Sequence, residues 1–216
     1  MLTMLKKIDW RLVAIFGGYA ILTAGYGLIQ IISDPVLIVH SVVDDWIPFC
    51  EWFVIPYVIW YPFVFLPAML FLIKERDSLF KMGSFIVAGL VVCITFFIVC
   101  PNGIDFRPDP ADFENKNFLT WLVGWLYAHD QPENVCPSLH VLDSLIVWAA
   151  IHHSPMLRKW RIWLSPLTGL VAILICLSTA FIKQHSVIDI VVAAGLFLLI
   201  YPFIYCRKRK TDEVSA

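Results

Sequence analysis

Long runs of apolar residues, separated by short polar segments, dominate the chain. Five runs have about the twenty residues that a helix needs to cross a hydrocarbon core of about 30 Å. A shorter run contains His140 and Asp143, and ionisable residues in such a run indicate a helix whose end lines a hydrated cavity. We therefore predict six transmembrane helices. The five long runs are Leu12–Ile32, Trp52–Ile73, Met82–Cys100, Ile162–Ile182 and Val187–Cys206, and the short run is Ser138–Ile151.

The composition agrees with a chain that is folded in lipid. Hydrophobic residues make up 60% of it and charged residues 15%, against about 45–50% and about 25% in soluble domains. A water-soluble fold of this size could not bury so much apolar surface. We expect one all-α domain over residues 1–216 with the lipid bilayer as its surroundings. Nothing indicates a nucleic-acid partner, and the sequence leaves the oligomeric state open.

The basic residues indicate how the helices are oriented. They cluster before the first run, between the second and third, between the fourth and fifth, and after the sixth. Because cytoplasmic loops carry an excess of Lys and Arg, both termini are predicted to be cytoplasmic. These residues are Lys6, Lys7, Arg11, Lys74, Arg76, Lys81, Arg158, Lys159, Arg161 and the run Arg207–Lys210. On the outer side only Arg107, Lys116 and Lys183 remain.

One apolar segment is too short to span the membrane. Phe118–Tyr127 has the sequence FLTWLVGWLY, and Trp and Tyr prefer the boundary between lipid and water. We predict a short interfacial helix here, in the loop between the third and fourth spans.

Three polar stretches fall at the outer ends of the predicted spans. Asn102–Pro108 follows the third span, Cys136–Val141 opens the fourth, and Ser178–Asp189 joins the fifth to the sixth. This topology puts all three at one depth, where they can meet. Cysteines border two of the stretches, at Cys100 and Cys136, so a disulfide there is an open alternative.

The residue types in these stretches suit phosphoryl transfer. Of two histidines at one site, one can attack phosphorus while the other protonates the departing oxygen. His185 and Asp189 are four residues apart and share a helical face, so the carboxylate can fix the tautomer of the imidazole. We therefore choose His140, His185 and Asp189 as candidate catalytic residues.

Other residues nearby could bind the phosphate. Ser138 lies at a predicted helix start, where free N–H groups favour an anion. Arg107 can bind phosphate oxygens in a bidentate manner, and Lys183 supplies a point charge. Asp143 could orient His140 or interact with Arg107, and it could equally be a hydrated structural carboxylate.

The motifs resemble those of a known family. Pro137–His140 (PSLH), followed by Ser178, His185 and Asp189 in the pattern S-x6-H-x3-D, looks like the second and third motifs of the type 2 phosphatidic acid phosphatase superfamily. Arg107–Pro108 resembles the end of its first motif. Residues 95–200 as a whole are more similar to the branch of inositol phosphorylceramide synthase-like phosphotransferases.

This resemblance implies a reaction through a phosphohistidine that needs neither a metal nor another cofactor. His185 would be the nucleophile, Asp189 its orienting partner and His140 the acid on the leaving group. Arg107, Ser138 and Lys183 would hold the phosphoryl oxygens.

Two positions depart from the family pattern. Cys100 stands where the first motif has a Lys, and the third motif begins Ser178–Thr179 instead of Ser-Arg. Thr179 is therefore a candidate phosphate contact, and Lys183 a candidate replacement for a missing cation.

Two functions follow from these observations. The first is a phosphatase or phosphotransferase that acts on a phosphorylated lipid at the extracytoplasmic face, with short loops that suggest a bacterial plasma membrane. The second, favoured by the missing cations, is a catalytically silent transporter or scaffold on the same fold.

Overall fold

The structure, a computed structural model, describes residues 9–32 and 34–206 and is mostly helical, as the apolar runs predict. Lys6, Lys7 and Arg207–Lys210, which carry part of the orientation argument, lie outside the described residues. The helices are α1 (Trp10–Ile32), α2 (Val42–Trp46), α3 (Val54–Lys74), α4 (Arg76–Val99), α5 (Phe118–His129), α6 (Leu139–His153), α7 (Arg161–Phe181) and α8 (Val187–Tyr201). Two short strands are β1 (Leu37–Ile38) and β2 (Asn102–Gly103), and single helical turns cover Glu51–Phe53, Pro110–Asp112, Arg158–Trp160 and Pro202–Cys206.

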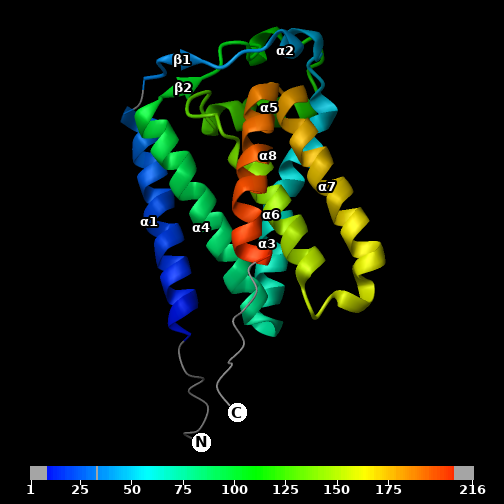
Figure 1. Cartoon of the computed structure of the whole chain (residues 1–216). Helices are drawn as coiled ribbons and strands as arrows, with labels where there is room; N and C mark the ends of the chain where they lie inside the picture. Colours follow the sequence, from blue (N-terminus) through cyan, green and yellow to red (C-terminus); the bar gives the residue numbers. More distant parts are fainter. Residues whose placement is uncertain (1–8, 33, 207–216) are drawn as a thin grey trace, which may run out of the picture.

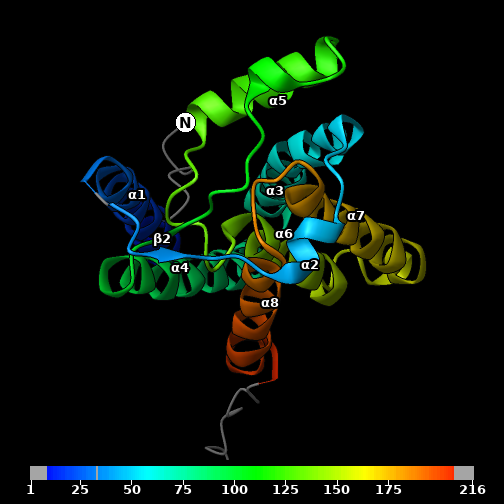
Figure 2. The same ribbon diagram turned by 90° about the horizontal axis from the view of Figure 1, so that it is seen from above.

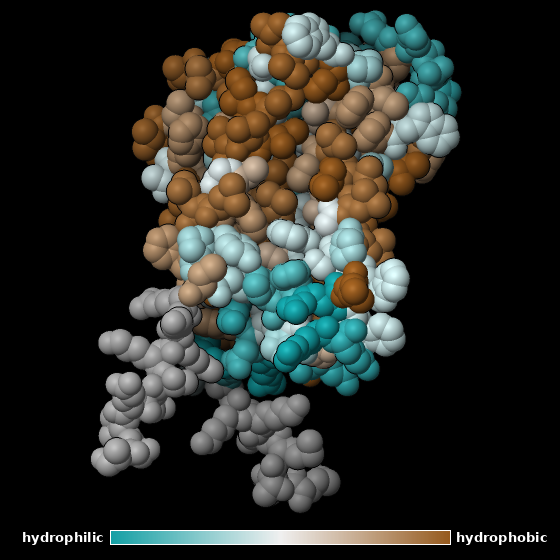
Figure 3. Space-filling model, turned by 45° about the vertical axis from the view of Figure 1, so that its right-hand side comes forward, coloured by the Kyte–Doolittle hydropathy of each residue, from teal (hydrophilic) through white to brown (hydrophobic). Residues whose placement is uncertain are grey.

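Five helices of the bundle are long and apolar enough to cross a membrane, and they correspond to the five long runs of the sequence. They are α1, α3 with the turn before it, α4, α7 with the turn before it, and α8 with the turn after it. They run roughly along one direction in Figure 1. Figure 3 shows hydrophobic side chains over most of the height of one face, with hydrophilic ones gathered at the lower end and at the upper right. This distribution is that of an integral membrane protein.

Helix α6 lies at the centre of the bundle. It packs against α3, α4, α7 and α8, and eight of its fifteen residues are buried. Fifteen residues extend for about 22 Å, which is less than the hydrocarbon thickness. Because the neighbouring helices surround it, the short helix does not have to match the bilayer by its own length.

The turn between α3 and α4 is shorter than predicted. The third run was expected to begin at Met82, but α4 begins at Arg76, and only Glu75 separates it from α3. Hydropathy missed the first helical turns because they carry charged residues. The Glu75 carboxylate accepts hydrogen bonds from Ser154 Oγ and from the backbone N–H of Met156. Glu75 thereby fixes this turn against the start of the segment between α6 and α7.

The opposite end of the bundle is covered by loops, and we call it the capped end. It carries the parallel pair β1–β2, the short helix α2 and the helix α5. Asn117 is the N-cap of α5, and its side-chain oxygen accepts from the N–H groups of Leu119 and Thr120. Seen from above, α5 lies to one side of the bundle (Figure 2), and Trp121 and Trp125 are exposed. The predicted short helix is confirmed.

Asn102 joins the loops of the capped end. Its side-chain amide donates to the carbonyls of Cys100 and Cys136, and its oxygen accepts from the N–H groups of Val135 and Cys136. The residue is fully buried. This amide therefore holds the segment before α6 next to the end of α4. Cys100 and Cys136 are both free thiols in the structure.

Close packing of α4 on α6 requires a glycine. A Cβ atom added to Gly89 would lie 2.6 Å from Cδ2 of Leu142, whereas one added to Gly195 in α8 would meet no atom within 4 Å. We predict that Gly89→Ala destabilises the protein by about 1–3 kcal/mol, as overpacking of a core does, and that Gly195→Ala does not. Thermal unfolding in detergent measures the difference, and equal midpoints for the two variants would contradict it.

Candidate active site

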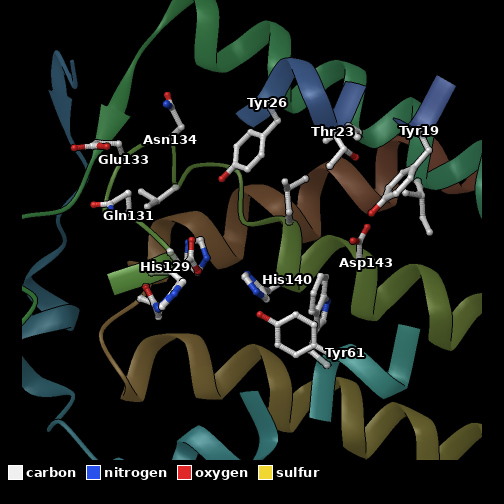
Figure 4. A pocket seen from close by; sticks show the side chains of 18 of the residues that line it. Tyr19, Thr23, Tyr26, Tyr61, His129, Gln131, Glu133, Asn134, His140 and Asp143 are labelled. Atoms are coloured by element: carbon white, nitrogen blue, oxygen red, sulfur yellow. The ribbon is translucent and has the colours of Figure 1, made fainter. Parts of the chain in front are cut away.

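A cavity of about 300 Å³ opens below the capped end, where α1, α3, α4 and α6 meet two loops. Figure 4 shows His140 and Asp143 of α6 in it, facing tyrosines of α1 and α3. His185, from the loop between α7 and α8, lies on the same wall as Arg107. Four of the residues singled out in the sequence therefore line one cavity.

His185 is oriented by a buried carboxylate. Its Nδ1 lies 3.2 Å from Oδ2 of Asp189, which is fully buried and also accepts from the backbone N–H of Ser186 at 3.0 Å. With Nδ1 turned to Asp189, the other ring nitrogen is left for a ligand. The thiol of Cys136 is next to Asp189, and burial together with that negative charge raises the pKa of Cys136 to about 12. Cys136 is thus a neutral neighbour of the carboxylate.

His140 lies beside His185 in an aromatic setting. The centroids of the two imidazole rings are 5.7 Å apart. Tyr57 and Trp60 of α3 pack on His140 with ring centroids at 4.7 and 4.6 Å. The hydroxyl of Tyr57 donates to Asp130 Oδ2 at 2.7 Å. These contacts fix the position of His140 without occupying its ring nitrogens, which make no hydrogen bond within the described part of the chain.

Arg107 is held in the cavity wall by neutral acceptors. Its guanidinium donates to the carbonyls of Asp130 and Gln131 and to the side-chain oxygen of Gln184, and it lies over the ring of Tyr127. Burial lowers the pKa of Arg107, although Asp130 acts in the opposite direction. A guanidinium stays protonated under such conditions. The side chain therefore places a fixed positive charge at the cavity.

Three N–H groups of cavity-lining residues have no acceptor among the described residues. They are Nε1 of Trp60, Nε of Arg107 and Nε2 of Gln184. Buried donors without a partner are costly, at about 1–3 kcal/mol each, and they are uncommon in folded proteins. All three side chains line the cavity, as does Asn134, whose buried side-chain oxygen also has no partner among the described residues. Gln184 was missed in the sequence, where its only signal is that it directly precedes His185.

Two of the predicted phosphate contacts, Ser138 and Thr179, do not line this cavity. Ser138 is the N-cap of α6, and its buried hydroxyl accepts from the N–H of Val141. Thr179 is buried in α7, where its hydroxyl donates to the Cys176 carbonyl and its own carbonyl accepts from the N–H groups of Gln184 and His185. The contribution of Ser138 and Thr179 is to position the helix start and the loop.

Lys183 points toward the loop between α1 and α3, which we call the first loop. Its Nζ donates to the carbonyls of Asp44 and Ile47 at 2.6 and 2.5 Å. Burial lowers the pKa of Lys183, and Asp44 and Asp45 act to raise it. Lys183 has a backbone φ of 55°. This left-handed conformation is unfavourable for residues other than glycine. The two hydrogen bonds of the ammonium group hold the loop in this conformation.

Asp44 links the first loop to the loop between α7 and α8 (residues 182–186), which we call the histidine loop. Its buried carboxylate accepts from Ser186 Oγ at 2.6 Å, from Val187 N–H at 2.8 Å and from Ser41 N–H at 2.8 Å. It therefore caps α2 and the start of α8 together. Nothing in the amino-acid pattern distinguishes Asp44 from the exposed Asp45 beside it.

Asp143, whose role the sequence leaves open, lines the cavity. It lies on α6 one turn from His140 and makes no hydrogen bond to His140, to Arg107 or to another described residue. In Figure 4 its carboxyl points toward the hydroxyl end of Tyr19 on α1. Asp143 is thus a cavity-facing carboxyl and does not orient the histidine.

Comparison with known sequences adds no assignment. No protein-family model matches the chain, and no curated protein matches it. The interpretation of the site depends on its own residues.

The role of Asp44 can be tested by substitution. We predict that Asp44→Ala lowers the stability, because three donors lose their acceptor at about 1–3 kcal/mol for each one that stays buried. Asp45→Ala removes an exposed carboxylate from the same helix and serves as the matched control. Thermal unfolding in detergent measures both variants. A Tm for Asp44→Ala equal to that of Asp45→Ala would show that the link is unimportant.

Proposed function

We propose that this protein is a six-span membrane enzyme that cleaves a lipid phosphoester through a phosphohistidine. In this proposal α6 is the sixth span, the bundle end opposite the capped end is cytoplasmic together with both termini, and the capped end is extracytoplasmic. The membrane is a bacterial plasma membrane. The basic residues at the α3–α4 and α6–α7 turns support this orientation, because cytoplasmic loops carry an excess of Lys and Arg. They are Lys74, Arg76, Arg158, Lys159 and Arg161.

One observation carries the proposal. Two histidines face one cavity, and one of them has a buried carboxylate behind it and unpaired N–H donors beside it. This is the set that a histidine nucleophile, a general acid and an oxyanion site require. The motif resemblance to the type 2 phosphatidic acid phosphatases points to the same chemistry.

The first step transfers the phosphoryl group to His185. The ring nitrogen turned away from Asp189 attacks phosphorus, and the bond from phosphorus to the lipid oxygen breaks. His140 gives its proton to that oxygen, which leaves as an alcohol. Asp189 stabilises the positive charge on His185, and Arg107 and Gln184 donate to the phosphoryl oxygens.

The second step returns the enzyme to its starting state. Water or an alcohol attacks phosphorus, His140 takes the proton of the attacking oxygen, and the bond from nitrogen to phosphorus breaks with its electron pair going back to the imidazole. Water as acceptor gives a phosphatase, and an alcohol gives a head-group transferase. The departures at Cys100 and Thr179 favour the transferase branch.

The phosphate site that we propose differs from the sequence expectation. Lys183 donates to backbone carbonyls, so it does not replace the missing cations of the family pattern. In this proposal uncharged donors take their place. Gln184 Nε2 and Trp60 Nε1 supply them beside Arg107. A cavity with one cation also suits a silent transporter or scaffold, which the following experiment separates from an enzyme.

We predict that His185→Ala abolishes turnover, because no other described side chain occupies the position of the nucleophile. Radiolabelled lipid phosphate is expected to leave an acid-labile label on the wild-type protein and none on His185→Ala. His40→Ala, in an exposed loop, is the control that keeps both signals. A wild-type protein that forms no phosphoenzyme with any lipid phosphate would favour the silent scaffold.

We also predict that Gln184→Glu raises KM for the phosphorylated lipid at least tenfold, which corresponds to about 1.4 kcal/mol. The substitution replaces an unpaired donor with a negative charge next to the phosphate. Asn115→Asp makes the same amide-to-acid change at an exposed position of the capped end. Steady-state kinetics with both variants give the comparison, and an unchanged KM in Gln184→Glu would remove Gln184 from the phosphate site.

A further inference from the structure

The phosphate cavity continues into a second, apolar cavity. This second cavity has a volume of about 250 Å³ and extends away from the capped end between α1, α3 and α4. The two share part of their lining, so they lie next to each other. The shared residues are Tyr19, Trp60, Tyr61, Ile86 and Asp143. We call the apolar part the slot.

The slot opens to the side of the bundle. Helix α1 packs along α4, with Ile15 against Gly83, and Figure 2 shows α1 and α3 apart from each other. The lining residues Phe16 and Phe65 are 49% and 60% exposed. In a membrane this side faces lipid chains. A hydrocarbon chain can therefore pass from the bilayer into the slot while its phosphate lies beside His185.

Asp143 is the one carboxyl residue of the slot lining, and it also lines the phosphate cavity. A carboxyl group among apolar side chains is costly unless it is hydrogen-bonded, and Asp143 has no hydrogen-bond partner in the described part of the chain. It is three residues beyond His140, which is about 4.5 Å along the helix. In a lipid whose phosphate lies at the two histidines, the atoms next to the phosphate-bearing carbon would lie at this distance along α6.

We infer that the substrate is a lipid phosphate with a hydroxyl or amide donor close to its phosphate, bound with this donor on Asp143 and one hydrocarbon chain in the slot. This inference rests on the proposed function and narrows its substrate class. Lysophosphatidic acid offers a hydroxyl on the glycerol, and ceramide 1-phosphate offers a hydroxyl and an amide on the sphingoid chain. Diacyl phosphatidic acid and polyprenyl phosphates offer no such donor.

The test measures kcat/KM for these four lipids with the full-length protein in detergent micelles. The dephosphorylated lipid is quantified, so that hydrolysis and transfer are both counted. The wild-type protein is expected to prefer the donor-bearing lipids at least tenfold. Asp143→Leu is expected to reduce this ratio to near one by slowing only the donor-bearing substrates. The two donor-bearing lipids show whether the hydroxyl of glycerol or that of a sphingoid chain is recognised.

The controls separate this inference from the proposed function. Asp105→Leu makes the same change at an exposed position and is expected to keep the preference. Ala68→Phe narrows the slot and is expected to lower kcat/KM for long chains at least tenfold relative to six-carbon analogues, which gives a second readout if Asp143→Leu does not fold. Turnover of all four lipids at similar rates, or a preference that survives in Asp143→Leu, would overturn the inference and leave the phosphohistidine intact. Absence of turnover and of a phosphoenzyme would overturn the proposed function itself.

Discussion

The buried carboxylate of Asp44 joins parts of the chain that are 142 residues apart. It caps α2 in the first loop and holds Ser186 and Val187 at the start of α8. His185 directly precedes Ser186, so its position depends on this contact as well as on Asp189. Lys183 adds two hydrogen bonds between the same two loops. The histidine loop is therefore fixed from outside the bundle by a loop and from inside by a helix.

The cavity beneath these loops has an unusual balance of charge. Arg107 is the one Lys or Arg among the described lining residues, while Asp130, Glu133 and Asp143 are carboxyls on the same surface. Three buried N–H groups of lining residues have no acceptor among the described residues. Neutral donors in a low-dielectric site can stabilise developing charge effectively, because they need no reorganisation. In the proposed function, these groups bind the phosphate in place of the Lys and Arg of the family pattern.

Long apolar runs were sufficient to predict most of the fold. They identified five long helices, the short helix α5 and the central helix α6, since each depends on local composition and length. Hydropathy missed the start of α4 because its first turn is charged. Of the residues selected from the sequence, His140, His185 and Arg107 line one cavity, and Asp189 contacts His185.

The sequence by itself determined which residue types were present at the ends of the spans and that these ends could meet. Only the tertiary structure decided what each side chain binds. Lys183 and Ser138 looked equivalent to Arg107 as phosphate contacts, yet only Arg107 lines the cavity. Asp44 and Gln184 have no distinguishing pattern, since their partners lie far away in the chain. Contacts of this kind arise from the packing of loops on a bundle, and a period of apolar residues carries no information about them.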